Sequence, residues 1–301
     1  MRRLGLAVLI CTFAGASLVE AAAGPEIQIE DVERFYEIYD AANGRPTVEQ
    51  LQRDYLDAGT DGLHTLTKIR NVTAQSIVDN ISKRPEMYTH AKRCLAVLPR
   101  VRERLDVSLR ELVRLYPQAR IPPVTIVVSR GKPVGVGYPD TGLQIGLEAL
   151  CAVDWFDPNL EDRFVNVIAH EYAHVQQTAS AGEDDFTVLQ RSLLEGVAEL
   201  VAEITSGKTA YSHFGPLTEG REQEIETAFV ADQDKTDLSQ WLDNSTLQQP
   251  ADLGYWVGYR IAKSYYQHAP DKPQALRDLL ETSDAKAVLA RSGWYPGIPL
   301  R

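Results

Sequence analysis

The sequence predicts an α+β protein that is mostly helical and contains one small sheet. Apolar residues recur at spacings of three and four over about 27–116, which is the pattern of amphipathic helices. A β-branched run at 124–128 and a second extended stretch at 143–147 then predict two strands. Two strongly helical segments follow at about 158–179 and 187–206, each with recognisable start and stop signals.

The first residues have the build of an export signal. Arg2 and Arg3 form a positive start, residues 4–19 are largely apolar, and three alanines precede a cleavage point before Gly24. An uncleaved membrane anchor is the alternative, but the apolar stretch is shorter than the ~20 residues that a span needs and contains Gly, Ser and Thr. We therefore expect residues 1–23 to be removed and the mature protein to be periplasmic or secreted, without a membrane span.

The length of 301 residues bounds the organisation of the mature chain. It suffices for one large domain or two modest ones. We expect an N-terminal helical region at 24–120 and a second region at 121–301 that carries the candidate site, the two forming one compact unit. The formal net charge of −11 becomes −12 when the signal, with two Arg and one Glu, is removed. This acidic balance argues against nucleic acid and anionic membrane surfaces as partners.

Two cysteines, Cys94 and Cys151, remain after removal of the signal. An oxidising compartment permits a bond between them, but the sequence does not show whether they meet.

The helical pattern of the first region is clearest near its end, and we interpret this region as scaffold. Its apolar positions there are Leu95, Leu98, Val101, Leu105, Leu109, Leu112 and Leu115. In the predicted sheet, a Gly/Pro-rich turn separates the two extended stretches. The GVG at 135–137 within this turn lacks the lysine and the spacing of a phosphate-binding loop, so we predict an ordinary loop there.

Capping residues delimit the two central helices. Asp157 is the expected N-cap of the first, with Pro158 in its first turn, and this helix stops before Gly182. The second opens near Asp185 or Thr187 and stops at Gly207. The chain from 208 onwards is polar and irregular until the helical pattern LGYWVGYRIAKSYYQ, and a final short helix is expected at about 271–290.

The first central helix contains the motif HEYAH. His170 and His174 are four residues apart and therefore lie on one face, so their imidazoles can point at a common spot. Zinc favours nitrogen ligands in a roughly tetrahedral arrangement, and Glu171 on the flank of this face can reach a water at the metal without being a ligand. Such a motif also arises by chance, but burying these three side chains in an apolar helix without a partner costs several kcal/mol. One zinc ion is the compensation that we expect.

The second helix supplies a third ligand. Glu195 and Glu199 are again four residues apart, and the residues near them are small, namely Ser192, Gly196, Ala198 and Ala202. A solvated acidic face is the alternative, but HEYAH upstream and a glycine in mid-helix favour a close approach of two backbones at a shared metal site. We predict Glu195 as the ligand and Glu199 as the acceptor that orients a ligating histidine. Cys151 is another candidate third ligand, although it has no helical relation to the histidines.

HEYAH followed at this distance by EGVAE resembles the gluzincin metallopeptidases, which pair HExxH with a later Glu ligand and an acidic residue four positions beyond it. More closely, VIAHEYAHVQQ, SLLEGVAELVAE, GYWVGYRIAKSYY and DAKAVLARSGW resemble a bacterial family of predicted, uncharacterised zinc-dependent proteases related to gliding-motility-associated lipoproteins. The resemblance runs from about residue 30 to the end and implies a zincin-like core. It differs from thermolysin-like members in having Glu rather than Asp at position 199.

This resemblance implies a zinc metallopeptidase that acts on a peptide or protein substrate, and the first residues indicate that it is exported. Glu171 then serves as general base towards a water activated by the metal, and the stretch 143–147 is the sheet edge that holds a substrate strand. A hydrogen-bond donor to the oxyanion is also needed. Tyr255 and Tyr259, one helical turn apart, are our candidates, with His213 as another. His64, His90 and His268 are expected at the surface or in packing.

Two other interpretations remain. A non-catalytic zinc-containing envelope or assembly protein keeps the metal without the chemistry, although a purely structural site has no use for Glu171. A helical envelope protein with a coincidental HEYAH has no metal, although the Glu195 and Glu199 pair argues against it. The sequence does not indicate substrate specificity, endo- or exo-action, or oligomeric state.

Overall fold

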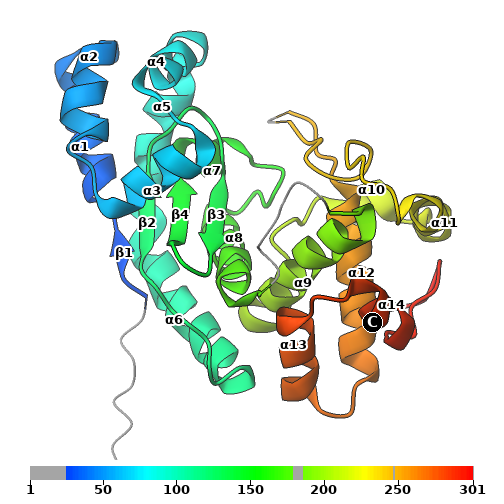
Figure 1. The fold of residues 1–301 in the computed structure, drawn as a ribbon. Helices are drawn as coiled ribbons and strands as arrows, with labels where there is room; N and C mark the ends of the chain where they lie inside the picture. Colours follow the sequence, from blue (N-terminus) through cyan, green and yellow to red (C-terminus); the bar gives the residue numbers. More distant parts are fainter. Residues whose placement is uncertain (1–24, 179–185, 247, 301) are drawn as a thin grey trace, which may run out of the picture.

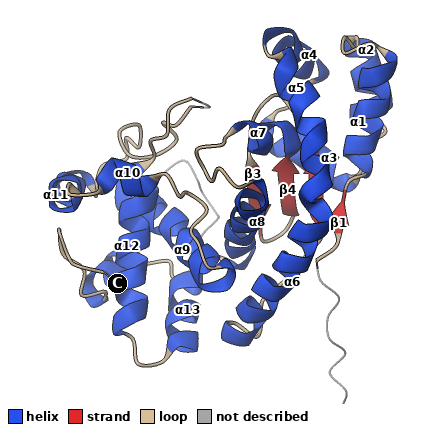
Figure 2. Cartoon of the chain, turned by 180° about the vertical axis from the view of Figure 1, so that it is seen from behind, coloured by secondary structure: helices blue, strands red, loops and turns tan. Residues whose placement is uncertain are grey.

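A small mixed sheet lies among helices, with the N-terminal helices on one side of the molecule and the C-terminal helices on the other (Figures 1 and 2). The computed structural model describes residues 25–178, 186–246 and 248–300, so the expected export signal at 1–23 lies outside the described residues. The predicted α+β, mostly helical class is confirmed. None of the described helices is both long enough and apolar enough to cross a bilayer.

The N-terminal part is helical from residue 30 onwards. The predicted helical region starts instead with a short strand, β1 (Ile27–Gln28), because these residues pair with a strand about a hundred positions later. The elements that follow are α1 (Glu30–Ala41), α2 (Val48–Gln50), η1 (Leu51–Leu56), α3 (Asp61–Arg70), α4 (Ala74–Lys83), α5 (Pro85–Ala91), η2 (Lys92–Val97) and α6 (Leu98–Leu115). The apolar positions predicted along α6 are buried, except for the half-buried Leu95 before it. Helix α6 packs against the central helices of the second half.

The sheet has the strand order β1-β2-β4-β3. Strands β2 (Val124–Val127) and β4 (Gly142–Gly146) are parallel, as are β1 and β2, whereas β3 (Gly135–Tyr138) is antiparallel to β4. The two predicted strands are therefore present. Two predictions about them are wrong. GVG belongs to strand β3 and is not a loop, and the stretch 143–147 is not an edge, because 143–146 lie in the inner strand β4, and β3 forms the edge next to it.

Helix α7 (Leu147–Ala152) links the sheet to the two central helices, α8 (Leu160–Gln176) and α9 (Val188–Ser206). The N-cap of α8 is Asn159 and not Asp157, because the Asn159 side chain accepts from the backbone N–H of Asp162. The Asp157 carboxylate instead accepts from the backbone N–H of Asn159. Thr187 caps α9 through a reciprocal pair of hydrogen bonds with Gln190, as predicted, while the alternative Asp185 lies outside the described residues. Gly207 ends α9 in the left-handed conformation, with φ of 95°.

The C-terminal part contains more helix than the sequence indicated. Helices α10 (Phe214–Thr218) and α11 (Glu222–Asp232) lie in the segment expected to be irregular, and α12 (Leu253–His268) follows as predicted. The prediction of a single final helix is wrong. That segment is divided into α13 (Lys272–Glu281) and α14 (Ala285–Arg291), because Thr282 is extended and Asp284 caps a new helix.

Helices α9 and α12 touch backbone to backbone. A Cβ atom on Gly258 of α12 would lie 1.7 Å from the Ser192 carbonyl oxygen, and one on Gly196 would lie 2.0 Å from the Gly258 carbonyl carbon. The small-residue face of α9 therefore allows the close approach that the sequence predicted, although the partner at this contact is α12. Another face of α9 packs against α8.

Two features connect α7 to its neighbours. Cys94 and Cys151 form a disulfide that joins η2 to α7. Glu148 on α7 is fully buried and accepts hydrogen bonds from the backbone N–H groups of Ser129 and Gly131 through Oε1, at 3.0 and 2.9 Å. Burial raises the pKa of Glu148 to about 7, although these two hydrogen bonds oppose the shift.

A Glu148→Gln substitution should change the pH dependence of stability. The folded-state pKa of Glu148 is raised, so its contribution to stability is fully present below the unfolded pKa near 4.5 and is lost as the pH rises through about 7. Glutamine keeps an acceptor oxygen and never ionises. We expect the free energy of unfolding of the variant, relative to wild type, to rise by about 3 kcal/mol between pH 4.5 and 8 in urea unfolding. Parallel stability curves for the two proteins would contradict this assignment.

A Gly258→Ala substitution should separate α9 from α12. The added methyl group meets backbone, which cannot rotate away as a side chain can, so we expect a loss of about 3 kcal/mol in the free energy of unfolding. Gly215→Ala is the matched control, because a Cβ atom there has no neighbour within 4 Å. Equal stability of the two variants would show that the helices do not pack as described.

Candidate metal centre

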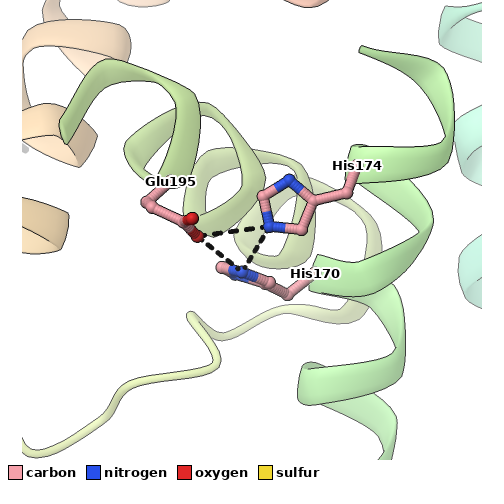
Figure 3. A group of neighbouring side chains, drawn as sticks. All are labelled: His170, His174 and Glu195. Atoms are coloured by element: carbon pink, nitrogen blue, oxygen red, sulfur yellow. Dashed lines mark hydrogen bonds and ion pairs between the residues drawn. The ribbon is translucent and has the colours of Figure 1, made fainter. Parts of the chain in front are cut away.

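Three potential ligand side chains from α8 and α9 converge on one point (Figure 3). The Nε2 atoms of His170 and His174 lie 3.1 Å apart. Glu195 Oε2 lies 3.3 Å from the first of these nitrogens and 3.2 Å from the second. His170 and Glu195 are 4 % and 3 % exposed, so these groups face one another largely out of contact with water. The structure thus brings together the three residues that the sequence proposed as ligands.

The local cause of this convergence is helical periodicity on two packed helices. His170 and His174 are one turn apart on α8, and Glu195 faces them from α9. In a tetrahedral site with metal–ligand distances of about 2.1 Å, two ligand atoms lie about 3.4 Å apart. The three separations of 3.1–3.3 Å are close to this value. The donor set and its spacing therefore fit a zinc ion.

Glu199 lies behind the first histidine. Its Oε1 atom is 2.7 Å from His170 Nδ1, the ring nitrogen that faces away from the ligand cluster. Glu199 is fully buried, and its Oε2 atom accepts a hydrogen bond from the backbone N–H of Tyr211 at 3.2 Å. This position suits the orienting role that the sequence predicted for Glu199.

Gln177 lies behind the second histidine and was not predicted. Its Oε1 atom is 2.7 Å from His174 Nδ1, and its Nε2 atom donates to the Leu194 carbonyl on α9, also at 2.7 Å. Both histidines therefore have an oxygen at Nδ1, which directs Nε2 towards the cluster. The spacing of three residues from His174 was a usable signal, since a residue at i+3 lies on the same helix face.

Arg191 is the second residue that the sequence analysis missed. Its Nη2 atom lies 3.0 Å from Glu195 Oε1, one helical turn away on α9. This ion pair occupies one carboxylate oxygen and leaves Oε2 facing the two imidazoles. The i, i+4 spacing of an arginine and a glutamate is common on solvated helices, so the sequence alone did not distinguish this pair.

These contacts shift the pKa values of His170 and Glu195. Burial disfavours the charged form of His170, but Glu195 and Glu199 outweigh it and raise the pKa of His170 to about 10. Burial also acts against ionisation of Glu195, yet Arg191 and the histidines hold the pKa of Glu195 well below its usual range. The cluster therefore stabilises positive charge at its centre, and zinc binding there must displace a proton from His170.

Glu171 lies beside the cluster, under the edge strand β3. A Cβ atom on Gly135 would lie 2.5 Å from Glu171 Oε1, and one on Gly137 would lie 2.2 Å from the Glu171 carbonyl oxygen. The close approach of β3 to α8 requires glycine at these two positions, because any side chain there would collide with Glu171. Burial raises the pKa of Glu171, although the charges of His174, His170 and Arg70 lower it in part.

The aromatic candidates separate into two groups. The Tyr255 ring is nearly parallel to the His170 ring at a centroid distance of 6.2 Å. Tyr211, which the sequence analysis passed over, stacks on Tyr255 at 4.7 Å and lies 5.9 Å from His170. Burial raises the pKa of both tyrosines well above its usual value, so their hydroxyl groups stay protonated and can donate. Tyr211 lies in an irregular segment, and no spacing relates it to the motif.

The remaining candidates make no hydrogen bond or ion pair with the three ligand side chains in the described residues. The Tyr259 hydroxyl group contacts Lys263 Nζ at 2.8 Å, and this lysine pairs with Glu203. His213 packs against Trp155, and burial lowers its pKa to about 4. Cys151 is excluded as a ligand because its sulfur is bonded to Cys94. His64, His90 and His268 do not join the cluster of possible ligands found in the described residues.

A Gln177→Ala substitution should weaken zinc binding by about 10–100-fold, because His174 loses the oxygen that fixes its ring. Gln177→Glu keeps that acceptor but loses the donor to the Leu194 carbonyl, so it should restore only part of the affinity. Exposed Gln75 provides the control Gln75→Ala, which should leave zinc affinity unchanged. The measurement is competition with a chelator at fixed pH, with unfolding of the metal-free proteins recorded alongside. An unchanged zinc affinity of Gln177→Ala would show that Gln177 does not orient the His174 ring.

Comparison with known proteins identifies a family. The family model described as "Predicted Zn-dependent protease (DUF2268)" matches residues 126–284, a span that contains all the residues of the candidate centre and more than half of the chain. Neither the curated proteins nor the solved structures contain a match. The protein thus belongs to the DUF2268 family of predicted Zn-dependent proteases.

Proposed function

We propose that this protein is an exported zinc-dependent peptidase with a zincin-like core, in which His170, His174 and Glu195 hold one zinc ion. The observation that carries this proposal is the position of Glu171. In the part of the chain that the structure describes, its carboxylate makes no hydrogen bond or ion pair, although Glu171 is only 8 % exposed. A carboxylate buried without a partner is costly, and the cost is explained if the group works on a substrate.

The proposed reaction assigns a separate role to each group in and around the cluster. Zinc bound there supplies Lewis acidity, which activates a water molecule and polarises a peptide carbonyl. Glu171 accepts the proton of that water and delivers it to the leaving amine, a role that suits a carboxylate whose pKa burial has raised. Tyr211 and Tyr255 stack beside His170 and are the candidate donors to the developing oxyanion. Tyr259 contacts Lys263 instead, so we assign it less weight.

The substrate strand is assigned to β3. Only β4 pairs with β3 within the described sheet, so the other edge of β3 offers backbone N–H and C=O groups to an extended peptide. Gly135 on this strand lies directly against Glu171. A peptide added to β3 would therefore pass close to the proposed general base. This replaces the role first expected for 143–147.

Export is supported by two features. The first 23 residues have the pattern of a cleavable signal, and Cys94 and Cys151 form a disulfide, a bond that persists in oxidising compartments. We propose a periplasmic or secreted location on this basis. A non-catalytic zinc-containing envelope protein is the second candidate, and it leaves the position of Glu171 unexplained.

Cleavage of an unbiased peptide library by wild type and Glu171→Gln tests the proposal. We expect wild type loaded with zinc to hydrolyse peptides and the variant to lose about 10²–10⁴-fold in kcat/KM, because proton transfer to and from the base is lost. Glu219→Gln, at an exposed glutamate, is the control and should cleave as wild type does.

Zinc content separates the possible failures. The Glu171→Gln variant should still bind about one zinc per chain, since Glu171 is not a proposed ligand. Cleavage that survives in Glu171→Gln would refute its role as base. A wild-type protein that binds zinc but cleaves no peptide would favour the non-catalytic alternative.

A further inference from the structure

We propose that Arg70 and Arg130 form an anion-binding site beside the edge strand β3, which selects peptides carrying an acidic side chain near the scissile bond. This inference rests on the proposed function. The two residues come from separate segments: Arg70 ends α3, and Arg130 lies in the loop that leads from β2 to β3.

The two arginines are held together and tied to β3. Arg130 Nη2 donates to the Arg70 carbonyl oxygen at 3.1 Å. Arg70 Nη2 donates to the Tyr138 hydroxyl oxygen at 3.2 Å, and its guanidinium lies 6.0 Å from the centroid of the Tyr138 ring. Tyr138 is the last residue of β3. These contacts fix the Arg70 guanidinium at the end of β3 and the Arg130 guanidinium at the end of α3.

Neither guanidinium has a carboxylate partner within residues 25–178, 186–246 and 248–300. Both side chains are half-buried, and the Nε atom of each is buried without a hydrogen-bond partner. Half-buried arginines elsewhere are neutralised, as Arg104 is by Asp162 and Arg191 by Glu195. In a chain with a formal net charge of −11, two arginines on neighbouring segments without a carboxylate partner in the described residues point to an external anion.

Strand register places these arginines on the outer face of the sheet. Gly135 and Gly137 face Glu171 on α8, so Val136 and Tyr138, which alternate with them along β3, point to the opposite face. On that face α3 packs, since a Cβ atom on Gly62 would contact Thr125 of β2. A peptide paired with β3 would direct alternate side chains towards the same face as Tyr138.

The chemistry favours a carboxylate on such a side chain. Arginine binds a carboxylate through paired N–H groups, with geometric selectivity that an amide or a lysine does not reproduce. Gly135, which lies against Glu171, and Tyr138, which contacts Arg70, are both in β3, so a peptide paired with this strand passes both groups. A free C-terminal carboxylate has the same chemistry, and amidated peptides distinguish the two sources.

The test compares kcat/KM for peptides that differ only by Glu, Gln or Lys at each position around the cleavage site, all with amidated C-termini. Wild type should prefer Glu over Gln by about tenfold at one or more positions. This ratio should fall towards one in Arg70→Gln and in Arg130→Gln. Arg70→Glu should prefer Lys, a gain that misfolding cannot produce. Arg102→Gln, at an exposed arginine on α6, should keep the wild-type ratio.

A second set of peptides with free C-termini identifies the source of the carboxylate. If only these peptides show a preference that depends on Arg70, the proposed acidic side chain is wrong and the site binds a terminal carboxylate. A wild-type Glu to Gln ratio near one, or a ratio unchanged in both arginine variants, overturns the proposal while peptide cleavage itself stands. Absence of any cleavage instead removes the proposed function. Binding of the same peptides to Glu171→Gln then still measures the selectivity.

Discussion

The contact of one carboxylate oxygen with two imidazoles is the interaction on which the site depends. Glu195 Oε2 lies within 3.3 Å of both Nε2 atoms, in a place almost closed to water. Charged groups lose most of their hydration there, so they persist only with good partners. Helix packing enforces the contact: Gly196 and Gly258 let α9 lie directly on α12, while Glu195, on a neighbouring face of α9, points towards α8.

The groups around this contact fix its direction. Each histidine has an oxygen behind it, a carboxylate for His170 and an amide for His174. Arg191 holds the remaining oxygen of Glu195. The Glu171 carboxylate, which lies beneath β3, makes no hydrogen bond or ion pair with the described residues. The ligand cluster, the proposed base and the proposed substrate strand are therefore neighbours, and the arginine pair lies on the outer face of that strand.

Local rules predicted the parts of the site that local structure determines. The spacing of His170 and His174 places them on one helix face in any α-helix, and small residues around Glu195 indicated a close helix contact. Strand β3 was missed because glycine has a low β propensity. Glycine is required there by the close approach to Glu171, a contact that exists only in the folded chain. Tyr211 was missed because tertiary packing alone brings its irregular segment against His170. The predicted N-cap of α8 was wrong for a simpler reason, since Asp157 and Asn159 are both suitable capping residues and lie two positions apart.

The X-ray absorption spectrum of zinc bound to the purified protein tests the central claim most directly. If His170, His174 and Glu195 hold the ion, the spectrum will show two imidazole ligands and oxygen ligands at about 2.0–2.1 Å, with no sulfur at about 2.3 Å. Glu195→Ala should change the oxygen contribution and leave both imidazoles. A protein that retains no zinc, or a spectrum with sulfur or with fewer than two imidazoles, would contradict the account.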